Sequence, residues 1–187
     1  MCIRDSITVN LTASNEVPVI TDLSGDNQNY IEGTGAVVIE QGADAVVADV
    51  DSANFDGGSL SVFFFSGDDD TEDVLSIRNQ GTGVGQIGVT GTDVTYEGTV
   101  IGTFTGGGGG ANLVVAFDED ATPLAVTALI RNITYENTDA ANPTDGTRNI
   151  HFQVADGDGA TSVSHVAQVN VTADNDGPVI TLSLIHI

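Results

Sequence analysis

TSVSHVAQVNV, residues 161–171, alternates apolar and polar side chains over most of its length. Successive side chains of a β-strand point to opposite faces, so this period of two is typical of a strand with one buried face and one face in water. Similar alternating or β-branched runs recur along the chain, separated by clusters of Gly, Asn and Asp that suit hairpin turns. The runs are residues 36–40, 45–50, 59–65, 74–77, 86–89, 94–96, 99–104, 112–117, 148–154 and 162–171. We therefore predict an all-β fold, an antiparallel β-sandwich.

Two segments depart from simple alternation. The three phenylalanines at residues 63–65 form a continuous apolar run, which favours a strand covered on both faces. In ATPLAVTALIRNITYEN, residues 121–137, apolar side chains recur at roughly helical spacing after a Thr-Pro pair that suits an N-cap and a first helical turn. The pattern predicts one short helix over residues 123–131 and then a strand at 133–135. We expect the helix to close one end of the core rather than to bind a ligand.

The two ends of the chain are complementary when they are written as DNA. MCIRDS, residues 1–6, can be encoded by ATG TGT ATA AGA GAC AG, and the reverse complement of this string encodes LSLIH, the start of residues 182–187. The element resembles the transposon end that is used to fragment DNA for sequencing libraries. We therefore expect residues 1–6 and 182–187 to be a sequencing-adapter artefact and interpret only residues 7–181 as protein.

One segment of the chain occurs twice. VNLTASNEVPVIT, residues 9–21, returns as VNVTADNDGPVIT, residues 169–181, with nine of thirteen positions identical. Such self-similarity is typical of a tandem array of domain-sized modules. We expect residues 7–16 to be the last strand and linker of a preceding repeat, residues 17–174 to be one complete repeat, and residues 175–181 to start the next.

The composition argues against several classes of partner. The formal net charge is −23, and residues 7–181 contain neither cysteine nor lysine. A strongly acidic chain repels nucleic acid and anionic lipid, so we expect neither nucleic-acid binding nor insertion into a membrane. Without cysteine, this part of the chain forms no disulfide framework and no thiolate metal site.

The residues that would support catalysis are not combined into a recognisable motif. The five glycines at residues 106–110 are not followed by the Gly-Lys-Ser/Thr of a phosphate-binding loop, and we interpret them as a hairpin tip. His151 and His165 have no serine elbow or cysteine partner in the sequence. Composition alone does not exclude paired carboxylates for glycoside hydrolysis, but the chain has three tyrosines and no tryptophan to serve as sugar platforms. We predict that the protein is not an enzyme.

Several acidic segments together resemble a known family. They are PVITDLSGDNQNYIEG at 18–33, VADVDSANFDGGSLSVFF at 47–64, FQVADGDGATS at 152–162 and VNVTADNDGP at 169–178. These segments are similar to the cadherin-like repeats of large bacterial adhesins (RTX-type surface proteins) and to chondroitin-sulfate-proteoglycan-type repeats. The resemblance implies an Ig/cadherin-like sandwich at the bacterial cell surface, with calcium at the junctions between consecutive repeats.

The resemblance also implies a set of calcium ligands. An Asn-Asp linker precedes a proline, a glutamate follows the first strand, an Asp-x-Asp motif ends a later strand, and an acidic turn precedes the last strand. The matching residues here are Asn15 and Glu16 in the first linker, Asn175 and Asp176 in the second, then Glu32, Asp49, Asp51, Asp156 and Asp158. The first linker departs from the family pattern, because Glu16 replaces the expected aspartate and Ser14 stands where the second linker has Asp174.

The chemistry of these positions agrees with the resemblance. Ca²⁺ takes six to eight oxygen ligands from carboxylates, carbonyls and water. On an extended strand, Asp49 and Asp51 would share one face about 6.6 Å apart, and in the expected sandwich they converge with Asp156 and Asn15 at one pole. Simpler interpretations remain open at this point: residues 156–159 as a solvated β-turn, and the linker asparagines as turn residues before proline. Exposed loops are the simpler interpretation for the acidic runs at 68–70 and 118–120.

We therefore expect a calcium-binding extracellular repeat with a structural or adhesive role in a large surface or secreted protein. Its expected partners are the neighbouring repeats of the same chain, with a cell-surface glycan or protein as a further candidate. The alternative is a glycan- or cell-binding head module. A hydrolase would need catalytic sequence outside residues 7–181.

Overall fold

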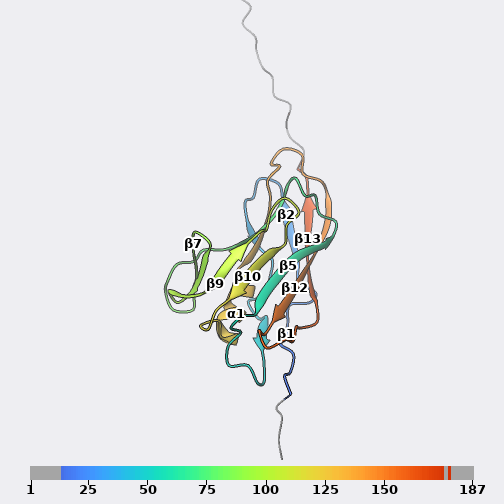
Figure 1. Cartoon of the computed structure of the whole chain (residues 1–187). Helices are drawn as coiled ribbons and strands as arrows, with labels where there is room; N and C mark the ends of the chain where they lie inside the picture. Colours follow the sequence, from blue (N-terminus) through green and yellow to red (C-terminus); the bar gives the residue numbers. More distant parts are fainter. Residues whose placement is uncertain (1–13, 175–176, 178–187) are drawn as a thin grey trace, which may run out of the picture.

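The computed structural model describes residues 14–174 and Gly177, and these form a β-sandwich with one short helix (Figure 1). The larger layer is an eight-stranded sheet in the order β2-β13-β12-β5-β10-β9-β8-β7. Its strands are β2 (Asn27–Ile31), β5 (Ser59–Ser66), β7 (Ile87–Thr90), β8 (Asp93–Tyr96), β9 (Thr99–Thr105), β10 (Leu113–Phe117), β12 (Gly146–Ala155) and β13 (His165–Thr172). Neighbouring strands in this sheet run antiparallel except β2 and β13, which pair in parallel from Asn27 opposite Gln168 to Ile31 opposite Thr172.

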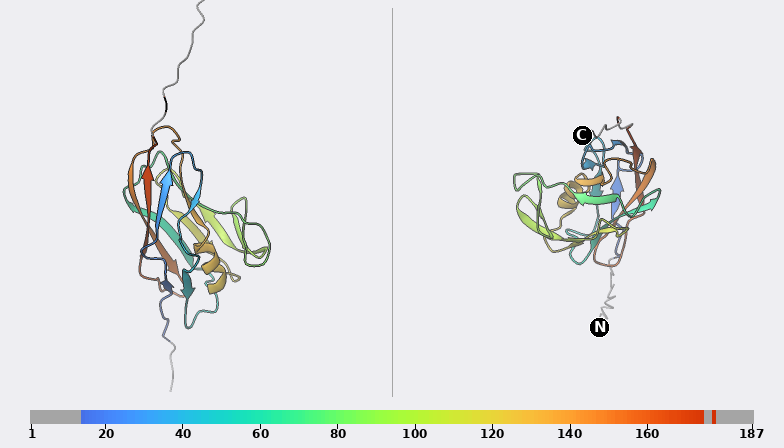
Figure 2. Two further views of the ribbon diagram at one scale, coloured as in Figure 1. Left: turned by 180° about the vertical axis from the view of Figure 1, so that it is seen from behind. Right: turned by 90° about the horizontal axis from the view of Figure 1, so that it is seen from above.

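The second layer is made of smaller pieces. A three-stranded sheet has the order β3-β11-β6, and a two-stranded sheet pairs β1 with β4. Their bounds are β1 (Val19–Thr21), β3 (Val37–Val38), β4 (Val46–Ala48), β6 (Asp73–Ile77) and β11 (Ile133–Asn137). The helix α1 (Pro123–Ile130) contacts β4 and β8 and lies on the same side of the large sheet, which Figure 2 shows from behind. The predicted all-β sandwich with one short helix is thus confirmed.

The core lies between these layers and follows the expected alternation. On β13, Ala167, Val169 and Val171 are buried, while the residues between them are only half-buried. The strand begins at His165, three residues later than the sequence pattern indicated. The helix was also predicted closely: the Thr122 hydroxyl accepts a hydrogen bond from the Ala125 N–H at 3.3 Å, so the expected N-cap forms. One face of α1 is buried in the core, namely Ala125, Val126, Leu129 and Ile130.

The phenylalanine run was predicted wrongly. Leu60 and Val62 of β5 are fully buried, but Phe63 is half-buried and Phe65 is 69% exposed. Phe65 lies on the outer face of the sheet and stacks on His151 of β12, with ring centroids 4.6 Å apart. The strand therefore keeps a period of two even where every side chain is apolar, and only its inner face is covered.

The five glycines form the connection between β9 and β10, as predicted. Gly107 within this connection has a φ of 96°, and its carbonyl accepts a hydrogen bond from the Leu75 N–H of β6 at 2.6 Å. A Cβ atom at this position would lie 2.2 Å from the Leu75 carbonyl oxygen, so only glycine allows the approach. The acidic runs at 68–70 and 118–120 lie outside the strands, as predicted.

The described chain starts and finishes at opposite ends of the long axis (Figure 1). At the N-terminal pole, the segment 14–18 enters beside the end of β4 and the loop between β12 and β13. At the C-terminal pole, β2 and β13 end together. Among the described residues there is no helix with the length and hydrophobicity needed to cross a bilayer.

Candidate metal centre

The segment before β1 is hydrogen-bonded to two acidic turns at the N-terminal pole. The Asn15 side-chain amide donates to Asp156 Oδ2 at 2.9 Å, and the Glu16 N–H donates to Asp51 Oδ2 at 3.1 Å. Asn15 and Asp156 are 141 residues apart in sequence, so the sandwich fold brings them together. We call the set formed by these residues and Asp49 the N-terminal cluster. Five of the nine predicted ligands belong to it.

Asp49 and Asp51 do not lie on an extended strand, which corrects the sequence prediction. The strand β4 ends at Ala48, and Asp49 Oδ1 then accepts the N–H groups of Asp51 and Ser52, both at 3.1 Å. This is an Asx-turn, in which the short carboxylate side chain captures backbone donors two and three residues ahead. The spacing estimated for an extended strand therefore does not apply here.

The second carboxylate oxygen of Asp49 has an unusual environment. Asp49 Oδ2 is buried and has no hydrogen-bond partner among the described residues, and the same holds for the neighbouring Ser52 Oγ. Shielding an anionic oxygen from water without a donor costs free energy. A bound cation would compensate this cost. Ca²⁺ is a hard cation that prefers oxygen ligands, so the Asp49 and Ser52 oxygens suit it. Ser52, which directly follows the Asp-x-Asp motif, was not among the predicted ligands.

Asp156 is the best-satisfied carboxylate of the N-terminal cluster. Its Oδ1 accepts the N–H groups of Asp158, Gly159 and Ala160 at 2.8, 3.0 and 3.0 Å, while Oδ2 accepts the Asn15 amide. Burial by itself raises the pKa of Asp156, but the hydrogen bonds from Ala160, Asn15 and the neighbouring amides outweigh it and hold the pKa below its ordinary value. Residues 156–159 do form a turn, but Asp156 is 1% exposed rather than solvated. Asp158 is exposed and contributes only its backbone N–H to this network.

Glu32 lies at the opposite pole from the N-terminal cluster. It follows β2, and its N–H donates to the Thr172 carbonyl at the end of β13 at 3.4 Å. Glu32 Oε2 is buried without a hydrogen-bond partner among the described residues, as is Asp49 Oδ2 at the other pole. The predicted ligands Asn175 and Asp176 lie outside the described residues.

A second set of acidic residues, which the sequence did not indicate, is paired with a buried arginine inside the fold. Arg148 is fully buried, and its Nε lies 2.9 Å from Asp73 Oδ2, while Nη2 lies 3.4 Å from Glu72 Oε1. Asp73 Oδ1 also accepts the Tyr135 hydroxyl and the Asn137 amide at 2.5 and 3.1 Å. Burial, and next to it the contact with Asp73, raise the pKa of the Tyr135 hydroxyl well above its ordinary value, so it stays a donor. We call this set the ion-pair cluster.

Within residues 14–174 and Gly177, no three His, Cys, Asp or Glu side chains are arranged so that they could hold a metal ion between them. The N-terminal cluster instead combines carboxylates with the side-chain amide of Asn15, and the Ser52 hydroxyl lies next to it in the turn after β4. No protein-family model matches the chain, and no curated protein and no solved structure is significantly similar to it.

Proposed function

We propose that this chain is a calcium-binding extracellular repeat that spaces and stiffens a large bacterial surface or secreted protein. The observation that carries the proposal is the pair of contacts Asn15–Asp156 and Glu16–Asp51. Through them, the segment that leads into the domain is tied to two acidic turns. A cation bound there would join the linker to the sandwich and so fix the angle at which one repeat follows another.

The distribution of unsatisfied oxygens supports a cation at this place. The described residues contain two buried carboxylate oxygens without a hydrogen-bond partner, and these belong to Asp49 and Glu32. One lies at each pole, and both poles are where a neighbouring repeat would attach. The net charge of −23 adds repulsion between carboxylates, which a divalent ion reduces.

The arrangement along the long axis supports the spacer role. The described chain enters at one pole and β13 runs to the other (Figure 1), so repeats joined end to end would extend rather than fold back. In such an array, the Glu32 pole of one repeat would face the Asn15 pole of the next.

Thermal melting with and without calcium tests the proposal. Extracellular calcium modules bind with Kd values of about 10⁻⁴ to 10⁻³ M, so 10 mM CaCl₂ should stabilise the protein by about 1.4–2.7 kcal/mol over EGTA. For a chain of this size the midpoint should rise by about 3–10 °C. The Asp49→Asn variant should lose most of this response, and MgCl₂ at the same concentration should give a smaller one. Equal midpoints in CaCl₂ and EGTA would contradict the proposal.

A further inference from the structure

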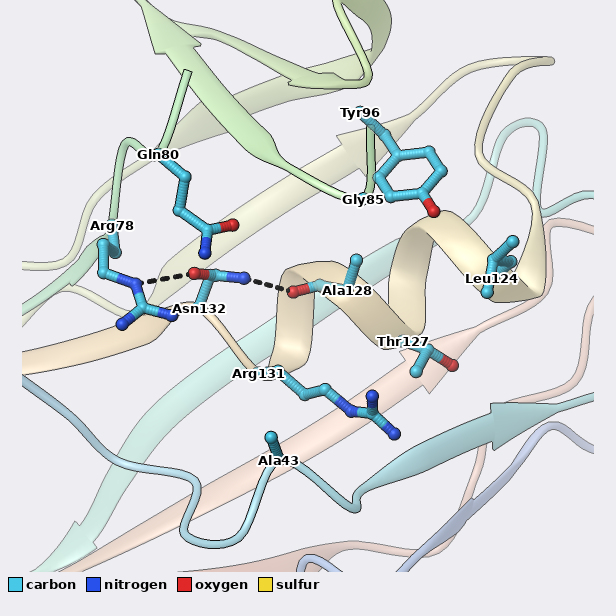
Figure 3. A pocket seen from close by; sticks show the side chains of 10 residues that line it. All are labelled: Ala43, Arg78, Gln80, Gly85, Tyr96, Leu124, Thr127, Ala128, Arg131 and Asn132. Atoms are coloured by element: carbon cyan, nitrogen blue, oxygen red, sulfur yellow. Dashed lines mark hydrogen bonds between the residues drawn. The ribbon is translucent and has the colours of Figure 1, made fainter. Parts of the chain in front are cut away.

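A cleft of about 310 Å³ lies beside α1 (Figure 3). Its walls come from α1 and the two residues after it, from the loop between β6 and β7, from the end of β8, and from Ala43 before β4. On the helix side, Leu124, Thr127, Ala128 and the C-cap residue Arg131 line the cleft. Leu124 is 65% exposed, whereas Thr127 is buried. None of the residues of the N-terminal cluster lines it.

Two of the three arginines between residues 7 and 181 line this cleft. The chain has 27 Asp and Glu residues against 4 Lys and Arg residues, so carboxylates are abundant as possible partners for each arginine. Yet among the described residues, neither Arg78 nor Arg131 has a carboxylate within 4.0 Å, and only Arg148 forms ion pairs. The cleft is therefore a cationic site on an otherwise strongly acidic protein.

Each of the two guanidinium groups is held in place by a hydrogen bond from its Nε, which leaves its Nη nitrogens available to a ligand. Arg78 Nε donates to Asn132 Oδ1 at 2.7 Å, and Arg131 Nε donates to the Ala45 carbonyl at 2.7 Å. Asn132 is itself fixed, because its amide donates to the Ala128 carbonyl at 2.8 Å. The Nη nitrogens of both arginines have no hydrogen-bond partner among the described residues. Donors that are positioned in advance lose less entropy when a ligand binds.

The other polar groups of the cleft also favour an acceptor ligand. Gln80 Oε1 accepts a hydrogen bond from the Ile87 N–H at 3.1 Å, so the Nε2 of Gln80 can donate to a ligand. Tyr96 adds an aromatic ring with a hydroxyl, and Leu124, which is 65% exposed, adds an apolar surface. The carboxylate of Glu97, the residue after Tyr96, interacts with the Tyr96 hydroxyl and accepts the Gly85 N–H at 2.8 Å.

We propose that this cleft binds an acidic saccharide unit, whose carboxylate or sulfate and hydroxyl oxygens are held by the Nη donors of Arg78 and Arg131. Arginine matches the geometry of such oxyanions with two parallel hydrogen bonds. The apolar surface of Tyr96 and Leu124 suits the face of a sugar ring, while Gln80 suits a hydroxyl. The volume lies at the lower end of the range for ligand pockets, which suits a single sugar unit. This site is independent of the calcium proposal and adds a recognition role to a spacer.

The test is an NMR titration of the full chain with sodium glucuronate, with glucose and sodium sulfate as parallel arms. Glucuronate should shift the amide signals of residues 78–80, 85 and 131–132 and should saturate, whereas glucose should bind at least about tenfold more weakly. Arg78→Gln and Arg131→Gln should each weaken glucuronate binding by about tenfold or more. The Gln28→Glu variant is the matched control, because it changes the net charge by the same −1 on β2, at the other end of the strand order.

Three results would overturn the proposal. The first is the absence of saturable binding of glucuronate, and the second is unchanged binding in both arginine variants. Because Arg78 is exposed, its replacement should leave the fold intact even if the Arg131 variant does not fold. The third result is sulfate binding as tight as glucuronate binding, which would indicate an oxyanion site without sugar recognition.

Discussion

Asp73, the first residue of β6, and Asp49, the residue after β4, are both aspartates at the boundary of a short strand, but their carboxylates are satisfied in different ways. Asp73 is 2% exposed, and both of its oxygens accept hydrogen bonds from buried side chains, above all from Arg148. Asp49 uses one oxygen for its own turn and keeps the other buried without a partner among the described residues. A carboxylate of the first kind is neutralised inside the fold. A carboxylate of the second kind keeps the capacity to bind a cation from outside.

The largest expected effect is that of Asp73→Asn. The substitution leaves the fully buried Arg148 with Glu72 as its only charged partner, and removing one member of a buried ion pair costs about 3–5 kcal/mol. Urea unfolding in EGTA measures this loss, and calcium should not reduce it.

If Asp73→Asn does not fold, Tyr135→Phe gives a smaller probe of the same cluster. It removes only the hydroxyl donor to Asp73 and should cost about 1–3 kcal/mol. A cost near zero for both variants would contradict the buried contacts of Asp73 with Arg148 and Tyr135.

The matching substitution in the other region, Asp49→Asn, should behave in the opposite way. In EGTA, an asparagine keeps the oxygen that accepts the Asp51 and Ser52 N–H groups and removes an uncompensated buried charge. The free energy of unfolding should therefore change by less than about 0.5 kcal/mol in chelator. Urea unfolding measures both aspartate variants in parallel. A loss in EGTA as large as that of Asp73→Asn would mean that Asp49 is structural.

The smallest expected effect on stability is the pH dependence that His165 causes. The imidazole of His165 has a buried nitrogen. Its Nδ1 contacts the Ser24 hydroxyl at 3.1 Å, while Nε2 is buried without a partner among the described residues. Burial lowers the pKa of His165 below 6.5, so the unfolded chain takes up the proton first as the pH falls. The contribution of His165 to stability is therefore complete above pH 6.5 and decreases as the pH falls toward the folded-state pKa. His165→Gln should flatten the stability profile between pH 7.5 and 5.5, and an unchanged slope would contradict this account.

The fold could largely be predicted because burial alternates along each strand and leaves a local signal. The helix was equally visible, since Thr122 and Pro123 mark its start. The strand β2 left little signal, because Tyr30 is its only buried residue. Its parallel pairing with β13 depends on contacts about 140 residues apart, which no local pattern encodes.

The candidate sites were predictable only in part. The resemblance to cadherin-like repeats indicated Asn15, Asp49 and Asp156 as neighbours, and the hydrogen bonds around them are consistent with that grouping. The turn after β4 was missed because a carboxylate that captures backbone donors looks the same in sequence as one on a strand. The two arginines of the cleft were missed because they come from different elements, and sequence does not show which charges lack partners.

The most direct test of the central claim is a titration of the backbone amide signals of the unaltered chain with CaCl₂ up to 10 mM. If calcium binds at the linker, the amide signals of Glu16, Asp51, Ser52 and Asp158 should shift most and should saturate at millimolar calcium. Small shifts without saturation, spread over the acidic loops at 68–70 and 118–120, would contradict it.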